Sequence, residues 1–146
     1  HKLVLAGSKY INGKKHVYES IKKYVLKNNL ISSIIMPGYI KKKQAVYYYN
    51  NAFTYVFPSI DEGFGIPLIE AMRARVPVIC SDIEIFKEIG GDSVIYFKKQ
   101  DHNDLYSKLK LIIENSIATK NLILKAKKRA DLFNQKNFIK GFEELN

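Results

Sequence analysis

Two glutamates with a glycine-rich segment between them are the residues of this sequence best suited to bind a polar ligand. Glu62 and Glu70 carry carboxylates that can accept hydrogen bonds from the hydroxyl groups of a sugar or a ribose. Gly63 and Gly65 lack side chains, so the backbone there can approach a ligand and adopt unusual dihedral angles. Pro67 is suited to the first turn of a helix, where its missing N–H costs nothing. Together these residues predict a binding loop that leads into a helix.

The start of this helix adds a potential site for an anion. In a helix that begins at Pro67, the backbone N–H groups of Ile66, Leu68 and Ile69 are expected to be unpaired, and with the helix dipole they favour a phosphate. The alternative is that the glycines only shape a turn and that both carboxylates are solvated or cap the helix. The segment lies between a buried strand and an apolar helix, and this combination favours the binding site.

Alternating apolar runs and helical patterns define the scaffold around this loop. Short apolar runs predict strands at residues 2–7, 34–36, 53–57, 78–80 and 94–97. Apolar residues at helical spacing predict helices at residues 14–26, 41–50, 67–74, 85–89, 101–115 and 117–133, and a last short helix from Asn137. Because strand and helix alternate, we expect an α/β fold: a Rossmann-like parallel sheet with helices on both faces and a helical C-terminal tail.

The carboxyl ends of the strands are the place to look for a ligand. In parallel sheets of this kind, ligands bind beyond those ends. This rule predicts that three segments lie beside one crevice: residues 38–40, 59–65 and 81–82.

Size and composition limit the classes of protein. The 146 residues fit one domain, residues 1–146, and no apolar run reaches the roughly 20 residues that span a bilayer. Cys80 is the only cysteine and lies in an apolar run, so it is expected to be a buried, inert thiol. The net charge of +10 raises the alternative of a basic nucleic-acid-binding domain, but the lysines are mostly scattered in pairs and no stacking or groove-reading motif accompanies them. Nucleic acid is therefore not expected as a partner, whereas peripheral contact with an anionic membrane stays open.

The segment from Glu62 to Glu70 resembles the E-x7-E signature of retaining glycosyltransferase family 4, whose fold is GT-B. Further segments that resemble the family follow in the family's order: LVLAG (3–7), GYI (38–40), AFTYVFPS (52–59), EAM (70–72), VPVI (76–79) and EIGGD (88–92). The resemblance covers most of the chain and implies the carboxy-terminal, nucleotide-sugar-binding half of such an enzyme.

The resemblance also implies roles for individual residues. Glu62 matches the catalytic-centre glutamate that contacts the donor sugar, and Glu70 matches the glutamate that holds the ribose hydroxyls. The backbone that meets the sugar hydroxyls and the diphosphate matches Gly63, Phe64, Gly65, Ile66 and Leu68. The segment that passes the nucleotide base matches Gly38, Tyr39 and Ile40.

For the whole enzyme, the resemblance implies hexose transfer from a UDP- or GDP-linked donor to a glycan or lipid-linked acceptor, without a metal or other cofactor. The acceptor site would lie in an amino-terminal domain absent from this sequence, as would the first strand–helix unit, whose Arg and Lys clamp the diphosphate. The fragment alone is expected to bind nucleotide weakly and not to turn over. A cytoplasmic location, with or without peripheral contact at the membrane face, is implied.

Two departures from the family pattern stand out. Arg75 occupies a position where the family commonly has glycine, and a tryptophan usual near the C-terminal helix is replaced around Gln135. The missing Arg and Lys leave an alternative function open, a non-catalytic module that binds a nucleoside diphosphate.

Overall fold

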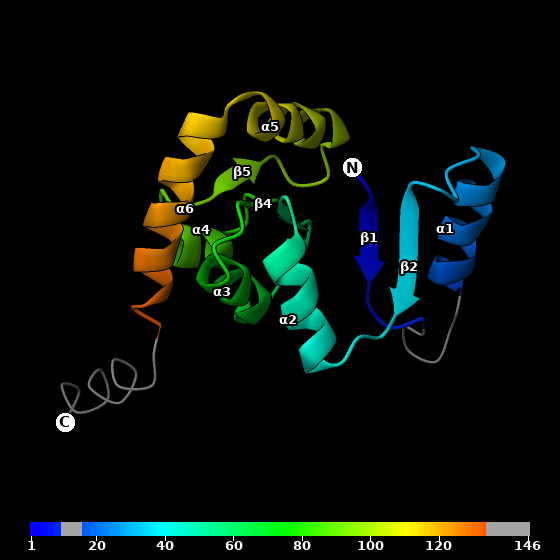
Figure 1. Cartoon of the computed structure of the whole chain (residues 1–146), viewed down its shortest axis with the longest axis horizontal. Helices are drawn as coiled ribbons and strands as arrows, with labels where there is room; N and C mark the ends of the chain where they lie inside the picture. The colour runs from blue at the N-terminus through cyan, green and yellow to red at the C-terminus, as the bar shows by residue number, and fades with distance from the viewer. Residues whose placement is uncertain (10–15, 134–146) are drawn as a thin grey trace. The chain divides into compact units, whose positions relative to one another are not determined.

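The computed structural model describes residues 1–9 and 16–133, which fall into two compact units, His1–Ala45 and Val46–Asn146 (Figure 1). The strands are β1 (Leu3–Ala6), β2 (Ile34–Gly38), β3 (Tyr55–Phe57), β4 (Val78–Ser81) and β5 (Ile95–Phe97). The helices are α1 (His16–Lys27), α2 (Lys42–Asn51), α3 (Ile66–Arg73), α4 (Glu84–Gly90), α5 (His102–Glu114) and α6 (Ser116–Ala130).

The first unit contains a two-stranded parallel sheet, in which β1 pairs with β2. α1 ends at Lys27, and Asn29 just beyond it has a φ of 55°, in the left-handed region that asparagine tolerates. The N–H of Leu30 then donates to the carbonyl of Val25 at 2.9 Å, which closes the last turn. Leu3 and Ala6 of β1 are exposed, whereas Val4 and Leu5 between them are half-buried.

The second unit contains a three-stranded parallel sheet in the order β3-β4-β5. Val56 of β3 pairs with Ile79 of β4, which pairs in turn with Ile95 of β5. β4 is buried along its whole length, because it has a strand on each side and helices over both faces.

The two faces of β4 belong to two clusters of apolar side chains. Ile79 packs on one face with Ile112 of α5. Val78 and Cys80 point to the other face, where the cluster includes Leu68, Ile69, Ala71 and Met72 of α3, Phe86 and Ile89 of α4, and Ala126 and Ala130 of α6. This alternation along a strand confirms the prediction of helices on both faces for this sheet.

α4 is fixed at its carboxyl end by α6 and β5. The guanidinium of Arg129 donates from Nε to the carbonyl of Ile89 at 2.5 Å and from Nη2 to the carbonyl of Glu88 at 2.6 Å. The hydroxyl of Tyr96 donates to the carbonyl of Gly91 at 2.9 Å. A cation that satisfies the last carbonyls of a helix also favours its dipole, so these contacts hold α4 in place.

The predicted α/β fold class, with parallel strands and flanking helices, is confirmed. The strands and helices predicted within the described residues are present, with bounds that differ by a few residues. The strands pair in two sheets, however, where the sequence predicted one. The helix predicted from Asn137, the start of the first helix at residue 14 and the position of Gln135 lie outside the described residues. Over residues 1–9 and 16–133, no helix is both long and apolar enough to cross a membrane.

α3 ends in a turn that normally requires glycine. The N–H of Arg75 donates to the carbonyl of Met72, and the N–H of Val76 donates to the carbonyl of Ala71, both at 3.2 Å. These two bonds define a Schellman motif, in which the first residue beyond the helix cap is left-handed. That residue is Arg75, with a φ of 60°.

Replacing Arg75 by glycine is expected to raise the free energy of unfolding by about 1 kcal/mol, because glycine adopts this φ without a clash of its Cβ. Urea unfolding of the two proteins measures the difference. Arg75→Ala is the matched control, since it removes the guanidinium and keeps the Cβ. Equal stabilisation by alanine would show that backbone strain is not the cause.

Candidate functional site

The segment between β3 and α3 holds the candidate site and carries a run of unpaired backbone donors. In the described chain, the N–H groups of residues 62–66 donate to no acceptor. The segment is nevertheless attached to the sheet, because the hydroxyl of Ser81 at the end of β4 donates to the carbonyl of Ser59. Two of the three segments predicted to meet, 59–65 and 81–82, are therefore brought together. The donors face no competing partner and could bind an anion or hydroxyl groups.

The two glycines of this segment differ in whether the fold requires a residue without a side chain at that position. Gly65 is buried with a φ of 66°, and a Cβ there would lie 3.0 Å from Cδ1 of Ile89 and 3.3 Å from Cε1 of Phe86. Gly63 is exposed, has no left-handed φ, and a Cβ on it would meet nothing within 4 Å. Folding thus requires glycine at 65 alone, and the space beside Gly63 is free for a ligand.

The helix begins one residue earlier than predicted. Gly65 is its N-cap, Ile66 is its first residue and Pro67 its second. As a result, the N–H groups of Leu68 and Ile69 both donate to the carbonyl of Gly65, at 2.9 and 3.4 Å. The prediction of three unpaired donors at the helix start was therefore wrong for two of them, and the free donors lie in the loop instead.

The two glutamates lie around one tyrosine. Glu62 is half-buried in the loop, and Glu70 is exposed in the second turn of α3. Burial raises the pKa of Tyr55 on β3, and the charges of Glu70 and Glu62 raise it further. Both carboxylates therefore lie near enough to the Tyr55 phenol to act on it electrostatically.

Tyr49 of α2 is a residue that sequence reasoning did not assign to the site. Its hydroxyl donates to Oε2 of Glu70 at 3.4 Å, and its ring meets the ring of Tyr55 edge-on with centroids 5.3 Å apart. Burial, followed by the charge of Glu70, raises the pKa of Tyr49 to about 12. Tyr49 is half-buried, and nothing in the sequence indicated its partner.

The third predicted segment, residues 38–40, belongs to the first unit. Gly38 closes β2 with a φ of 78°, and its carbonyl accepts a hydrogen bond from the N–H of Gly7 at 2.9 Å. Tyr39 is 78% exposed, so its ring is available for a ligand, and Ile40 is half-buried. The proposed contact of these residues with a nucleotide base stays a prediction.

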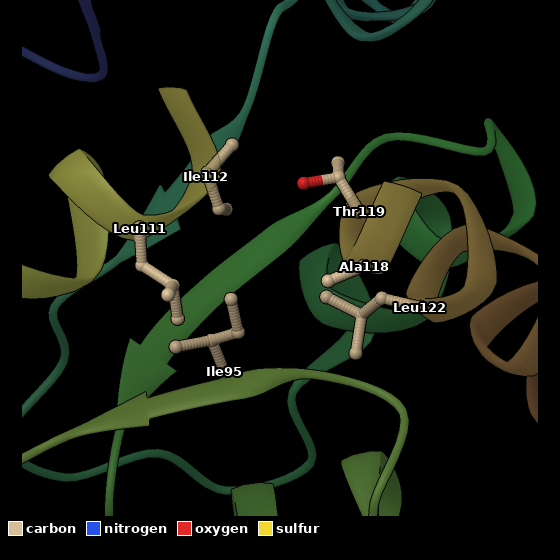
Figure 2. Close-up of a pocket in the computed structure, with 6 residues that line it drawn as sticks. All are labelled: Ile95, Leu111, Ile112, Ala118, Thr119 and Leu122. Atoms are coloured by element: carbon tan, nitrogen blue, oxygen red, sulfur yellow. The ribbon is translucent and has the colours of Figure 1, made fainter. Parts of the chain in front are cut away.

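Other groups of the second unit lack features of a site. Cys80 is buried, and burial raises its pKa to about 12, which fits an inert thiol. Within the described ranges, no cluster of three His, Cys, Asp or Glu side chains could hold a metal ion. Figure 2 shows a cavity beside β5 with nearly apolar walls, lined by Ile95, Leu111, Ile112, Ala118, Thr119 and Leu122. It contains none of the predicted site residues and no charged group.

The fold defines the class of protein first. The structure aligns with a sucrose-phosphate synthase of Thermosynechococcus elongatus over 99% of this chain and 37% of that one, at 26% identity and a TM-score of 0.84. It aligns with Anabaena HepE, solved in complex with UDP and glucose, over 88% of this chain and 35% of that one, at 17% identity and a TM-score of 0.80. The fold is that of GT-B glycosyltransferases.

The sequence then gives the family. The family model described as glycosyl transferases group 1 matches residues 1–129, and the chain belongs to this family. A curated relative, the O-antigen chain mannosyltransferase RfbU of Salmonella typhimurium, is 47% identical over 64 residues, which are 44% of this chain and 18% of the relative. The chain thus corresponds to well under half of these longer proteins.

Proposed function

We propose that this chain is the donor-binding domain of a retaining glycosyltransferase that moves a hexose from a nucleotide-diphosphate sugar to a glycan or lipid-linked acceptor. The observation that carries the proposal is the loop between β3 and α3. There, residues 62–66 present unpaired N–H groups between two carboxylates. Such a loop can hydrogen-bond a diphosphate and the hydroxyls of two sugar rings at once.

Each part of the loop has a chemical task in this proposal. Glu62 accepts hydrogen bonds from the donor hexose and stabilises the positive charge that develops on its ring, without a covalent intermediate. Glu70 accepts from the ribose hydroxyls. The N–H groups of Gly63 to Ile66 stabilise the charge of the leaving diphosphate. No step requires a metal or another cofactor.

The comparisons support the kind of substrate. RfbU is named as a mannosyltransferase of the O-antigen chain, so mannose is the first hexose to test and a polysaccharide the first acceptor. HepE was solved with UDP and glucose, which supports a nucleotide sugar as the ligand of this fold. We place the acceptor site in an amino-terminal domain and the enzyme in the cytoplasm or at its membrane face.

Calorimetric titration with GDP-mannose, UDP-glucose, GDP and UDP tests the proposal. We expect one nucleotide series to bind the chain, and Glu70→Gln to weaken that affinity about tenfold, because a charged acceptor for ribose hydroxyls is lost. Glu88→Gln is the matched control, since Glu88 is an exposed carboxylate on another helix of the same unit.

Two results would contradict the proposal. If neither nucleotide series binds, the donor-binding function is wrong. If one binds equally well to the Glu62→Gln and Glu70→Gln proteins and to their parent, the site is elsewhere. Binding of DNA that falls steeply with salt would instead favour a nucleic-acid-binding domain.

A further inference from the structure

Glu70 has an unusual partner for a carboxylate in so basic a protein. The chain has 24 lysines and arginines. Over the described residues, however, none of them lies within ion-pair distance of Glu70, whose side chain bonds to the Tyr49 hydroxyl alone. A cation would compete with a ligand for both carboxylate oxygens. A single neutral donor on Oε2 leaves Oε1 free to accept from another hydroxyl.

We propose that Tyr49 is a positioning residue that holds the Glu70 carboxylate so that its second oxygen faces the ribose of the donor. This inference rests on the proposed function, because it assigns the ligand of Glu70. Tyr49 itself need not touch the nucleotide. It acts by limiting the rotation of an exposed side chain that would otherwise sample several rotamers.

Tyr49 is itself held by a row of aromatic rings that reaches the core. Its ring packs on Tyr55, and Tyr55 lies 5.7 Å from Phe57 between ring centroids. Phe57 in turn lies 4.7 Å from Phe86, which is fully buried in α4. Edge-on and tilted ring pairs of this kind are favourable. The phenol therefore reaches Glu70 from a fixed base rather than from a mobile loop.

The protonation state of the Tyr49 hydroxyl also suits this role. Tyr49 keeps its proton at neutral pH, as an unperturbed phenol with a pKa of about 10 also would, and burial raises its pKa further, to about 12. It remains a neutral hydrogen-bond donor toward the carboxylate and adds no negative charge beside the diphosphate.

The test compares Tyr49→Phe with Tyr48→Phe in calorimetric titrations of the chain. Tyr48 is the adjacent half-buried tyrosine and forms no hydrogen bond to Glu70. The probes are GDP and UDP and their 2′,3′-dideoxy forms, which lack both ribose hydroxyls. We expect Tyr49→Phe to weaken binding of the ribonucleotide three- to tenfold and to leave the affinity for the dideoxynucleotide unchanged. Tyr48→Phe should change neither affinity.

A double-mutant cycle with Glu70→Gln separates this inference from the function on which it rests. If Tyr49 acts through Glu70, the tyrosine substitution has no further effect once the carboxylate is gone. If Glu70→Gln weakens the ribonucleotide and Tyr49→Phe does not, the positioning role is wrong and the donor site stands. If Glu70→Gln has no effect either, the proposed ribose contact is wrong. Equal loss of both nucleotide forms in Tyr49→Phe would indicate a general structural role and overturn the inference.

Discussion

Replacing Glu62 by glutamine is expected to lower the rate of hexose transfer by about two orders of magnitude in the full-length enzyme that the proposed function implies. The amide has nearly the shape of the carboxylate, so the loop keeps its fold. What is lost is the negative charge beside the sugar ring, which becomes positive as the bond to the diphosphate breaks. Initial rates with a radiolabelled nucleotide hexose measure the effect.

Asp61 provides the control for this experiment. It is the neighbouring residue of the same loop and carries an exposed carboxylate. Asp61→Asn removes the same charge one position away and should leave the rate within about twofold of the parent enzyme. The affinity for the free nucleoside diphosphate should change in neither variant, because Glu62 acts on the sugar. A Glu62→Gln enzyme with the parent's rate would remove Glu62 from the reaction centre.

The Gly65→Ala substitution is expected to destabilise the second unit by about 3 kcal/mol. A left-handed φ costs a residue with a Cβ about 1–2 kcal/mol, and overpacking adds a similar amount. The overpacking arises because the new methyl group lies 3.0 Å from Ile89 and 3.3 Å from Phe86. Both neighbours are buried, and Arg129 holds their helix in place. Thermal unfolding should show a midpoint lower by roughly 10 °C.

Gly63→Ala is the matched variant, and it is expected to change ligand affinity rather than stability. Its Cβ would enter open space, so the free energy of unfolding should change by less than about 0.5 kcal/mol. If the donor approaches the backbone here, nucleotide-sugar affinity should fall about tenfold or more. An unchanged affinity would show that the ligand does not pass beside Gly63, and a large loss of stability would contradict the open geometry described above.

Much of the fold could be predicted from the sequence because its signals are local. Apolar runs and helical spacing define each strand and helix from a few neighbouring residues, and alternation along Val78, Ile79 and Cys80 reflects the two covered faces of β4. The pairing of strands was harder to predict, since it depends on residues far apart in the chain. The sequence therefore predicted one sheet where two sets of strands pair.

In the candidate site, too, local features could be predicted from the sequence and long-range contacts could not. The structure has Glu62 in the loop before α3 and Glu70 within α3, and the roles that the resemblance implies for them stay predictions. The left-handed Gly65 is the N-cap of α3, so the helix begins one residue before the predicted start. The position of this cap could not be predicted, because Gly65 packs against Phe86 and Ile89 of α4, which lie far along the chain. Tyr49 could not be assigned, because its contact with Glu70 joins two helices on either side of β3 and has no sequence pattern.

The loop that carries Glu62 is fixed at both of its ends. The hydroxyl of Ser81 binds the carbonyl of Ser59 at one end, and Gly65 is packed against α4 at the other. A segment held in this way has already lost much of its conformational entropy during folding, so ordering it around a ligand costs little more. The free N–H groups of the loop are thus preorganised, and binding energy can go into discrimination between donors rather than into ordering the loop.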